Sequence, residues 1–120
     1  MDDDYLEAVL DLVADVPPGR VMTYGSIAEV LRDRLGRGGA RQVGQVMANA
    51  GGGVPWWRVV NAAGQPPARL RATAVARLRE EGCPLTDGER SDDVDARVVV
   101  RRAVWWPEAR AGSGSAQRPA

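Results

Sequence analysis

Three consecutive segments near the start of the chain space their apolar residues as one buried helical face does, and this constrains the fold most. The segment 5–16 carries Leu6, Val9, Leu10 and Val13; 24–35 carries Tyr24, Ile27, Ala28 and Leu31; 40–50 carries Val43, Val46 and Met47. Side chains at i, i+3, i+4 and i+7 lie on one side of an α-helix. We therefore predict three helices over these segments, sharing one core.

The loop 36–39 between the second and third helices is short and rich in glycine, as in a helix-turn-helix. The outer face of the third helix would carry Arg41, Gly44, Gln45 and Ala48. Small side chains on such a face let the helix backbone approach another surface closely, so this face is a candidate for DNA contact. The same pattern equally suits a helical pair packed inside an enzyme or a regulator.

The rest of the chain is less regular. A fourth helix is expected over 71–81, where Ala74, Val75 and Leu78 would be buried. The valine-rich stretch 97–104, together with Val94, predicts a short strand or hairpin. At 120 residues we expect one small domain over 1–108, mainly α-helical, followed by a disordered tail over 109–120 that is composed mostly of Ala, Gly, Ser, Arg and Pro.

Charge is strongly segregated although the net charge is zero. Residues 1–19 hold six acidic residues and no basic one, whereas residues 20–79 hold ten arginines against Glu29 and Asp33. A basic stretch of this size suits a phosphate-binding face. The alternative is a solvated surface whose arginines pair with the acidic ends of the chain.

Residue types that are absent from the sequence limit the reactions that the protein could catalyse. The chain has no histidine, so the usual general base and most nucleophile-activating pairs are absent, and we expect neither a metal nor a cofactor. A single cysteine, Cys83, fits a reducing compartment. The chain has no apolar run near 18 residues, and its acidic start is unlike a signal peptide. We therefore expect a cytoplasmic, nucleoid-associated protein that is monomeric and has no membrane contact.

Four segments together resemble the O6-alkylguanine-DNA alkyltransferases, in family order and with near-family spacing over about residues 5–85. They are Val21-Met22-Thr23-Tyr24-Gly25-Ser26-Ile27-Ala28, Ala40-Arg41-Gln42-Val43-Gly44, Pro55-Trp56-Trp57-Arg58-Val59 and Glu81-Gly82. The resemblance implies a winged-helix-like DNA-binding domain with a helix-turn-helix, as in the C-terminal domain of the transferases.

The third segment departs from the family where the chemistry would occur. The family motif is Pro-Cys-His-Arg-Val, in which the cysteine accepts the alkyl group and the histidine activates it. Here Trp56 and Trp57 stand at those positions, and an indole offers neither a thiolate nor a base. The pattern resembles the alkyltransferase-like proteins, which implies binding of O6-alkylguanine in duplex DNA, extrusion of the lesion into a pocket, and its presentation to a nucleotide excision repair damage-recognition protein. Glu81 matches the third catalytic position and is expected to have nothing left to orient.

The resemblance also implies roles for single residues. Arg41 resembles the arginine that fills the gap left by the extruded nucleotide, and Tyr24 resembles the tyrosine that crowds the neighbouring phosphate. Gln42 and Gln45 are further candidates for DNA contact on the third helix. For the lesion pocket we expect the set Trp56, Arg58, Val59 and Arg69, with Arg69 stacked on the flipped guanine by cation–π attraction.

Two other functions remain open from the residues alone. A sequence-specific winged-helix regulator would use Gln42 and Gln45 for base contacts and would ignore lesions. An active transferase or another DNA enzyme would have to use Cys83 or Glu81. A binding protein without covalent chemistry fits the composition best.

Overall fold

The computed structural model describes residues 3–49, 53–86 and 95–107. Its elements, in chain order, are α1 (Asp3–Asp15), β1 (Met22–Thr23), α2 (Tyr24–Leu35), α3 (Ala40–Asn49), the 3₁₀ turn η1 (Trp56–Arg58), β2 (Val59–Val60), the 3₁₀ turn η2 (Ala68–Leu70), α4 (Arg71–Glu80) and α5 (Val100–Ala103). The four predicted helices are present, each within two residues of its expected bounds. The predictions for Val94 and for the tail over 109–120 lie outside the described residues.

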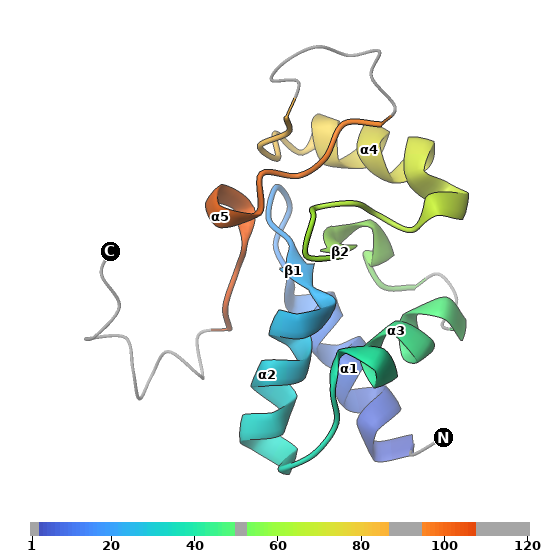
Figure 1. Ribbon diagram of the computed structural model, residues 1–120, viewed down its shortest axis with the longest axis vertical. Coiled ribbons are helices and arrows are strands. Elements are labelled where there is room, and N and C mark those ends of the chain that lie inside the picture. The colour runs from blue at the N-terminus through green and yellow to red at the C-terminus, as the bar shows by residue number, and fades with distance from the viewer. Residues whose placement is uncertain (1–2, 50–52, 87–94, 108–120) are drawn as a thin grey trace, which may run out of the picture.

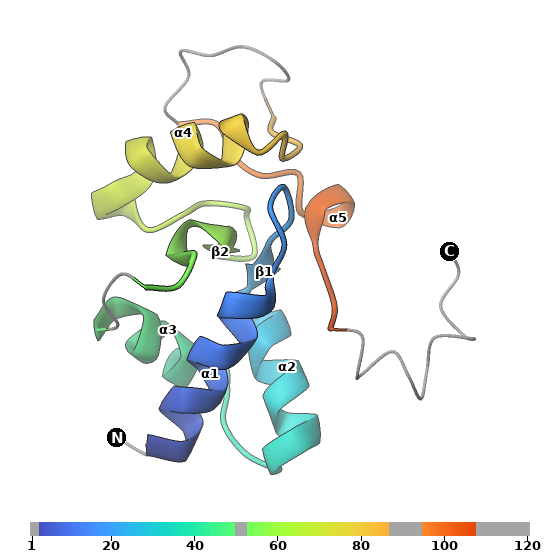
Figure 2. The same ribbon diagram turned by 180° about the vertical axis from the view of Figure 1, so that it is seen from behind.

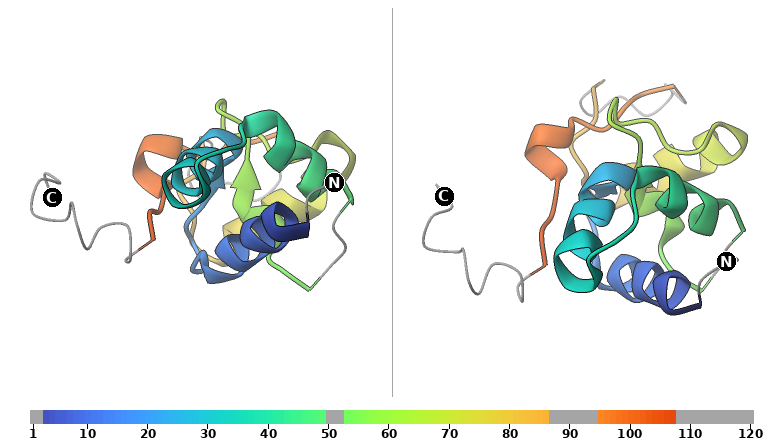
Figure 3. Two further views of the ribbon diagram at one scale, coloured as in Figure 1. Left: turned by 90° about the horizontal axis from the view of Figure 1, so that it is seen from below. Right: turned by 60° about the horizontal axis from the view of Figure 1, so that its bottom comes forward.

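Helices α1, α2 and α3 pack side by side around the first of two core clusters (Figure 1, Figure 3). Val9 and Val13 of α1 are fully buried, as expected. The buried face of α1 is nevertheless turned from the predicted one, because Leu6 and Leu10 are only partly buried. The remaining buried residues of α1, which were not predicted, are Tyr5 and Leu12. The buried face is rotated because α1 contacts both α2 and α3.

Helices α2 and α3 form the expected helix-turn-helix. Thr23 caps the start of α2: its hydroxyl accepts the N–H of Ser26, and the Ser26 hydroxyl accepts the N–H of Thr23, each at 2.9 Å. Gly36 ends α2 in the left-handed conformation, which glycine adopts without steric cost. Residues next to α2 in the sequence therefore fix where this helix begins and ends.

A two-stranded parallel sheet, which the sequence did not predict, joins the two halves of the molecule (Figure 1, Figure 2). Met22 pairs with Val59 and Thr23 with Val60. Successive residues of a strand point to opposite sides. Accordingly Met22 and Val59 belong to the first core cluster, whereas Val21 and Val60 belong to the second.

The second core cluster lies beneath α4 and includes Leu78, Cys83, Leu85 and Val98. The prediction of a strand or hairpin over 97–104 was wrong. Only single bridges form there, Val98 antiparallel to Leu85 and Val104 parallel to Val21, and the residues between them turn into α5. Arg20 satisfies two carbonyls at the end of that turn, those of Ala103 and Val104, which favours the helical conformation over an extended one.

Among the helices of the described ranges, none has both the length and the apolar character that crossing a bilayer requires.

Gly64 tests the connection between β2 and the following loop. Its φ is +85°, its carbonyl accepts the N–H of Val98 at 2.9 Å, and an added Cβ would collide with the Val98 backbone. We expect Gly64→Ala to lower the free energy of unfolding by roughly 2–4 kcal/mol, since strain and a backbone clash add together. Gly36→Ala is the control, because Gly36 also has positive φ but has open space around its Cβ, and it should cost about 1 kcal/mol. Urea denaturation measures both, and equal losses would contradict the clash.

Candidate nucleic-acid interface

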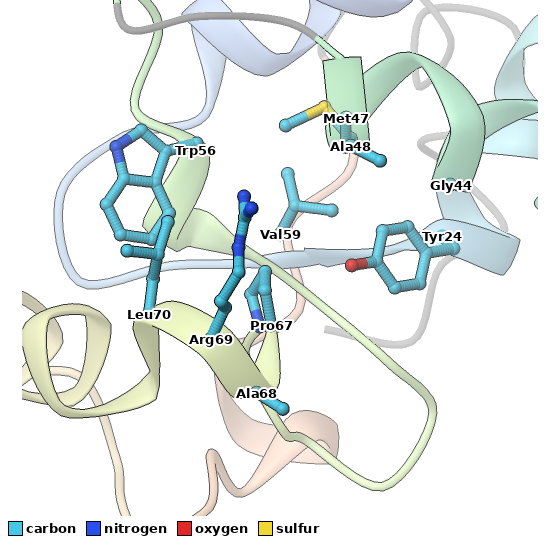
Figure 4. Close-up of a pocket in the computed structure, with 10 residues that line it drawn as sticks. All are labelled: Tyr24, Gly44, Met47, Ala48, Trp56, Val59, Pro67, Ala68, Arg69 and Leu70. Carbon is cyan, nitrogen blue, oxygen red and sulfur yellow. The ribbon is translucent and has the colours of Figure 1, made fainter.

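A pocket of about 390 Å³ opens between α3, η1, η2 and the start of α2 (Figure 4). This volume falls within the range of small-molecule sites in proteins. The lining is mostly apolar, with one cation and one phenol. It consists of Tyr24, Gly44, Met47, Ala48, Trp56, Val59, Pro67, Ala68, Arg69 and Leu70.

The small sheet explains how distant segments meet here. Tyr24 is the first residue of α2, directly after β1, and Trp56 begins the turn that leads into β2. Because Met22 pairs with Val59, the buried Val59 lies between these two aromatic side chains (Figure 4). Three of the sequence-predicted site residues, Tyr24, Trp56 and Val59, are thus brought together by a pairing of four residues.

Tyr24 presents its hydroxyl to the pocket (Figure 4). Burial raises the pKa of this phenol above its ordinary value, so the hydroxyl is protonated at neutral pH and can donate a hydrogen bond. The phenol is therefore a neutral donor rather than a charge.

Arg69 comes from η2, and its guanidinium reaches across the pocket between Trp56 and Tyr24 (Figure 4). Its neighbour Leu70 is 40% exposed at the rim of the pocket. The expected pocket residue Arg69 is therefore present, whereas Leu70, Pro67 and Ala68 were missed. The irregular loop that carries them shows no periodicity from which burial is predicted.

The outer face of α3 supplies one wall. Gly44 and Ala48, predicted on that face, line the pocket, and so does Met47, which was predicted in the core but is only partly buried. Arg41 and Gln45 are exposed on the same helix. Gln42 is also exposed, but its side-chain oxygen accepts the N–H of Gly39 at 3.0 Å and so helps to begin α3.

Arg58, expected in the pocket, does not line it. Its guanidinium forms a two-pronged ion pair with Glu81, at 3.1 and 2.6 Å, and donates to the carbonyl of Val16 at 2.9 Å. Both side chains are about six-sevenths buried. Arg58 therefore ties η1 to α1 and α4 instead of contacting the cavity.

Glu81 has more partners than the sequence suggested. Besides Arg58, it accepts the N–H of Gly19 at 3.1 Å and the indole N–H of Trp57 at 2.9 Å. Burial acts to raise the pKa of Glu81, but the hydrogen bonds from Arg58, Gly19 and Trp57 outweigh it and hold that pKa below its ordinary value. The expectation that Glu81 has nothing left to orient was wrong, because it holds the second tryptophan.

Cys83 lies in the second core cluster, away from the pocket lining. Burial and the nearby Glu81 charge raise the pKa of its thiol to about 11. A thiol with such a pKa is about one part in ten thousand ionised near pH 7. In residues 3–49, 53–86 and 95–107, no three Cys, Asp or Glu side chains gather as metal ligands would.

Comparison with known proteins places this geometry in a class. The model of the 6-O-methylguanine DNA methyltransferase, DNA binding domain, matches residues 4–83. The chain is 35% identical over 109 residues to the DNA base-flipping protein of Vibrio parahaemolyticus serotype O3:K6 (strain AQ3810), covering 88% of this chain and 99% of that protein. It is 42% identical over 89 residues to alkyltransferase-like protein 1 of Schizosaccharomyces pombe (strain 972 / ATCC 24843), covering 69% of this chain and 80% of that protein.

Two crystal structures share the fold. The structure of S. pombe ATL in complex with DNA superposes with a TM-score of 0.69 at 30% identity, and that of S. pombe Atl1 in complex with damaged DNA containing O6-carboxymethylguanine with 0.68 at 30% identity. Each comparison covers 89% of this chain and 99% of the other. The chain belongs to the 6-O-methylguanine DNA methyltransferase DNA-binding domain family, among its alkyltransferase-like and DNA base-flipping proteins. The expected mainly helical domain and the family resemblance are thereby confirmed.

The Glu81 cluster predicts a defined loss of stability. Glu81→Gln should lower the free energy of unfolding by about 2–4 kcal/mol near pH 7, because Arg58 then keeps its buried charge without a carboxylate. Glu80→Gln, the same change at the exposed neighbouring position, is the control and should have little effect.

The pH dependence of that loss has a definite sign. The folded-state pKa of Glu81 is below its ordinary value of 4.5, so the unfolded chain takes up the proton first as the solution is acidified. The stabilisation is complete above the ordinary value and is lost as the pH falls through the lowered folded-state pKa. Urea denaturation of the wild-type protein and of Glu81→Gln, from about pH 7 to pH 3, should show the difference between their free energies of unfolding shrink. A difference that stays constant would contradict the role of the Glu81 charge.

Proposed function

We propose that this protein binds duplex DNA containing O6-alkylguanine, extrudes the damaged nucleotide into the pocket beside α3, and transfers no alkyl group. The observation that carries the proposal is the pocket itself, in which an indole, a phenol and a guanidinium surround a cavity with a buried valine at its base. A flat base needs stacking surfaces and a few polar contacts at its edge, and this lining offers both.

The arrangement around α3 supports approach to a duplex. Gly44 and Ala48 have small side chains, and nothing lies within 4 Å of the Cβ position of Gly44, so a DNA backbone has room there. Arg41 is exposed on this helix, where a planar guanidinium can occupy the gap left in the base stack. We infer that α3 enters the DNA groove, with Arg41 in the stack and Tyr24 beside the phosphate of the lesion. Gln42 and Gln45 then face the same DNA.

Exposed arginines extend this face. They lie in the second half of α2 and in the loop before α3, namely Arg32, Arg34 and Arg37. Their density matches the basic stretch seen in the sequence and suits phosphate contacts, which orient a protein on DNA without reading its sequence.

The proposed absence of alkyl transfer is supported by the groups in the pocket and behind it. Trp56 has no nucleophilic atom, and the indole of Trp57 donates a hydrogen bond to Glu81 but cannot accept a proton as a base would. Cys83, the alternative nucleophile, is buried, and its pKa of about 11 keeps it a thiol. A protein that holds a lesion and leaves it chemically unchanged must pass it on, so we also propose a nucleotide excision repair damage-recognition protein as the partner of the DNA-bound monomer, in the cytoplasm.

A titration of one duplex carrying guanine, O6-methylguanine or a bulkier O6-alkylguanine tests the proposal directly. We expect both lesions to bind about 5–30-fold more tightly than guanine, which corresponds to stacking and cation–π contacts of about 1–2 kcal/mol. Affinity for all three duplexes should fall steeply with salt. Equal affinities combined with a strong preference for one base sequence would favour a regulator that reads bases through Gln42 and Gln45.

The chemistry has its own test. When the protein is incubated with DNA labelled on the O6-methyl group, we expect the label to remain on the DNA, because no acceptor thiolate faces the pocket. Labelled protein separated from DNA by denaturing electrophoresis is the readout, and an active alkyltransferase is the positive control. Stoichiometric label on the protein, abolished in Cys83→Ser, would instead establish a transferase.

Arg69 is expected to distinguish damaged from undamaged bases. Arg69→Ala should weaken lesion binding by about 1–2 kcal/mol and leave guanine binding nearly unchanged, because only an extruded base reaches the guanidinium. Arg101→Ala removes the same charge from an exposed position on α5 and is the matched control. If Arg69→Ala lowers both affinities alike, Arg69 is a phosphate contact and not part of lesion recognition.

A further inference from the structure

Trp56, the aromatic wall of the pocket, belongs to neither of the two core clusters. It begins η1, a 3₁₀ turn of three residues whose preceding residue, Pro55, makes no side-chain capping bond. The ring of Trp56 meets the ring of Trp57 edge-to-face, with centroids 5.7 Å apart and planes at 88°. This is a favourable geometry for two aromatic rings. The orientation of the pocket wall therefore depends on where Trp57 lies.

Trp57 is held from several sides. Its indole N–H donates to Glu81 at 2.9 Å, the Arg77 guanidinium lies 4.6 Å from its ring centroid, and the Arg58 guanidinium lies 5.3 Å from it. The ring also packs against the second core cluster. These contacts fix both the position and the plane of the indole.

Glu81 is fixed in turn by groups outside the pocket. It accepts the N–H of Gly19, in the turn that follows α1, and it pairs with Arg58. A continuous set of contacts therefore runs from the end of α4 through Glu81 and Trp57 to the ring of Trp56. No residue of this set other than Trp56 lines the pocket.

We propose that Trp57 is a positioning residue for lesion recognition: its N–H bond to Glu81 holds the ring of Trp56 in the orientation that receives a flipped base. The proposal rests on the function proposed above, since it concerns the wall of the same pocket. A wall that is already ordered before binding does not lose conformational freedom when the base enters, and this favours affinity for the extruded base alone.

The ratio of lesion affinity to guanine affinity tests this role. Trp57→Phe keeps an aromatic ring beside Trp56 but removes the N–H, and we expect the ratio to fall about three- to tenfold, the net effect of one typical hydrogen bond. Affinity for the guanine duplex should not change. Trp57→His, which restores an N–H donor towards Glu81, should recover part of the ratio. Trp105→Phe, the same change at a partly buried position outside the pocket lining, is the control and should leave the ratio intact.

A DNA-free measurement separates this proposal from the proposed function. In the wild-type protein the indole N–H of Trp56 should be rigid, with an order parameter near about 0.85, and in Trp57→Phe it should fall towards about 0.6. If the wild-type protein shows no lesion preference, the proposed function fails, while an order parameter that falls still supports positioning of the wall. An unchanged order parameter would overturn the role of Trp57, and so would an unchanged ratio when the wild-type protein does prefer the lesion.

The wild-type protein alone serves if Trp57→Phe does not fold. The Trp57 indole N–H should exchange slowly with solvent both in the free protein and with lesion DNA bound, because Glu81 accepts it throughout. Rapid exchange in the complex would mean that the bond is broken when the base enters, and this would overturn the proposal.

Discussion

The parallel pairing of β1 with β2 is the interaction on which the rest of the structure depends. It joins only four residues, but they lie between the two core clusters and contribute to both, because alternate side chains of a strand point in opposite directions. The first cluster holds the helix-turn-helix, and the second holds α4 together with Ala96, Val98 and Ala103. The same pairing places Val59 between Tyr24 and Trp56. The pocket is thus a consequence of how the two halves are joined.

Glu81 has a structural role in this molecule, although the family resemblance matches it to a catalytic position. The resemblance of the surrounding segments predicts a catalytic position here, but the carboxylate accepts an indole N–H and pairs with Arg58. Neither contact supports proton transfer to or from a substrate. Both hold the chain near the pocket, so the carboxylate serves the shape of the binding site. Arg58 was also expected to line the pocket, but it lies outside the lining and pairs with Glu81.

The proposed binding of a flipped base does not depend on covalent chemistry. The features that suit recognition of a flipped base are a stacking indole, a phenol that remains protonated, a guanidinium and a helix with small residues on its outer face. Each of these features can contribute to binding a base without a nucleophile. The one thiol in the chain is buried in the second core cluster, and its raised pKa keeps it unreactive.

The sequence by itself determined the helices, the helix-turn-helix and the family, since helical spacing and motif order are local properties: α2 even has the predicted bounds. From the family resemblance it also predicted that Trp56 stands at the position of a nucleophile. Only the tertiary structure decided which arginine reaches the pocket, because other segments surround Arg58 and Arg69 differently. Arg58 meets the carboxylate of Glu81, directly after α4, whereas Arg69 meets an open cavity. The two-residue strands and the helical turn at α5 could not be predicted from the sequence either. Segments this short have no periodicity of their own, and their conformation depends on partners as distant as Val21 and Val104.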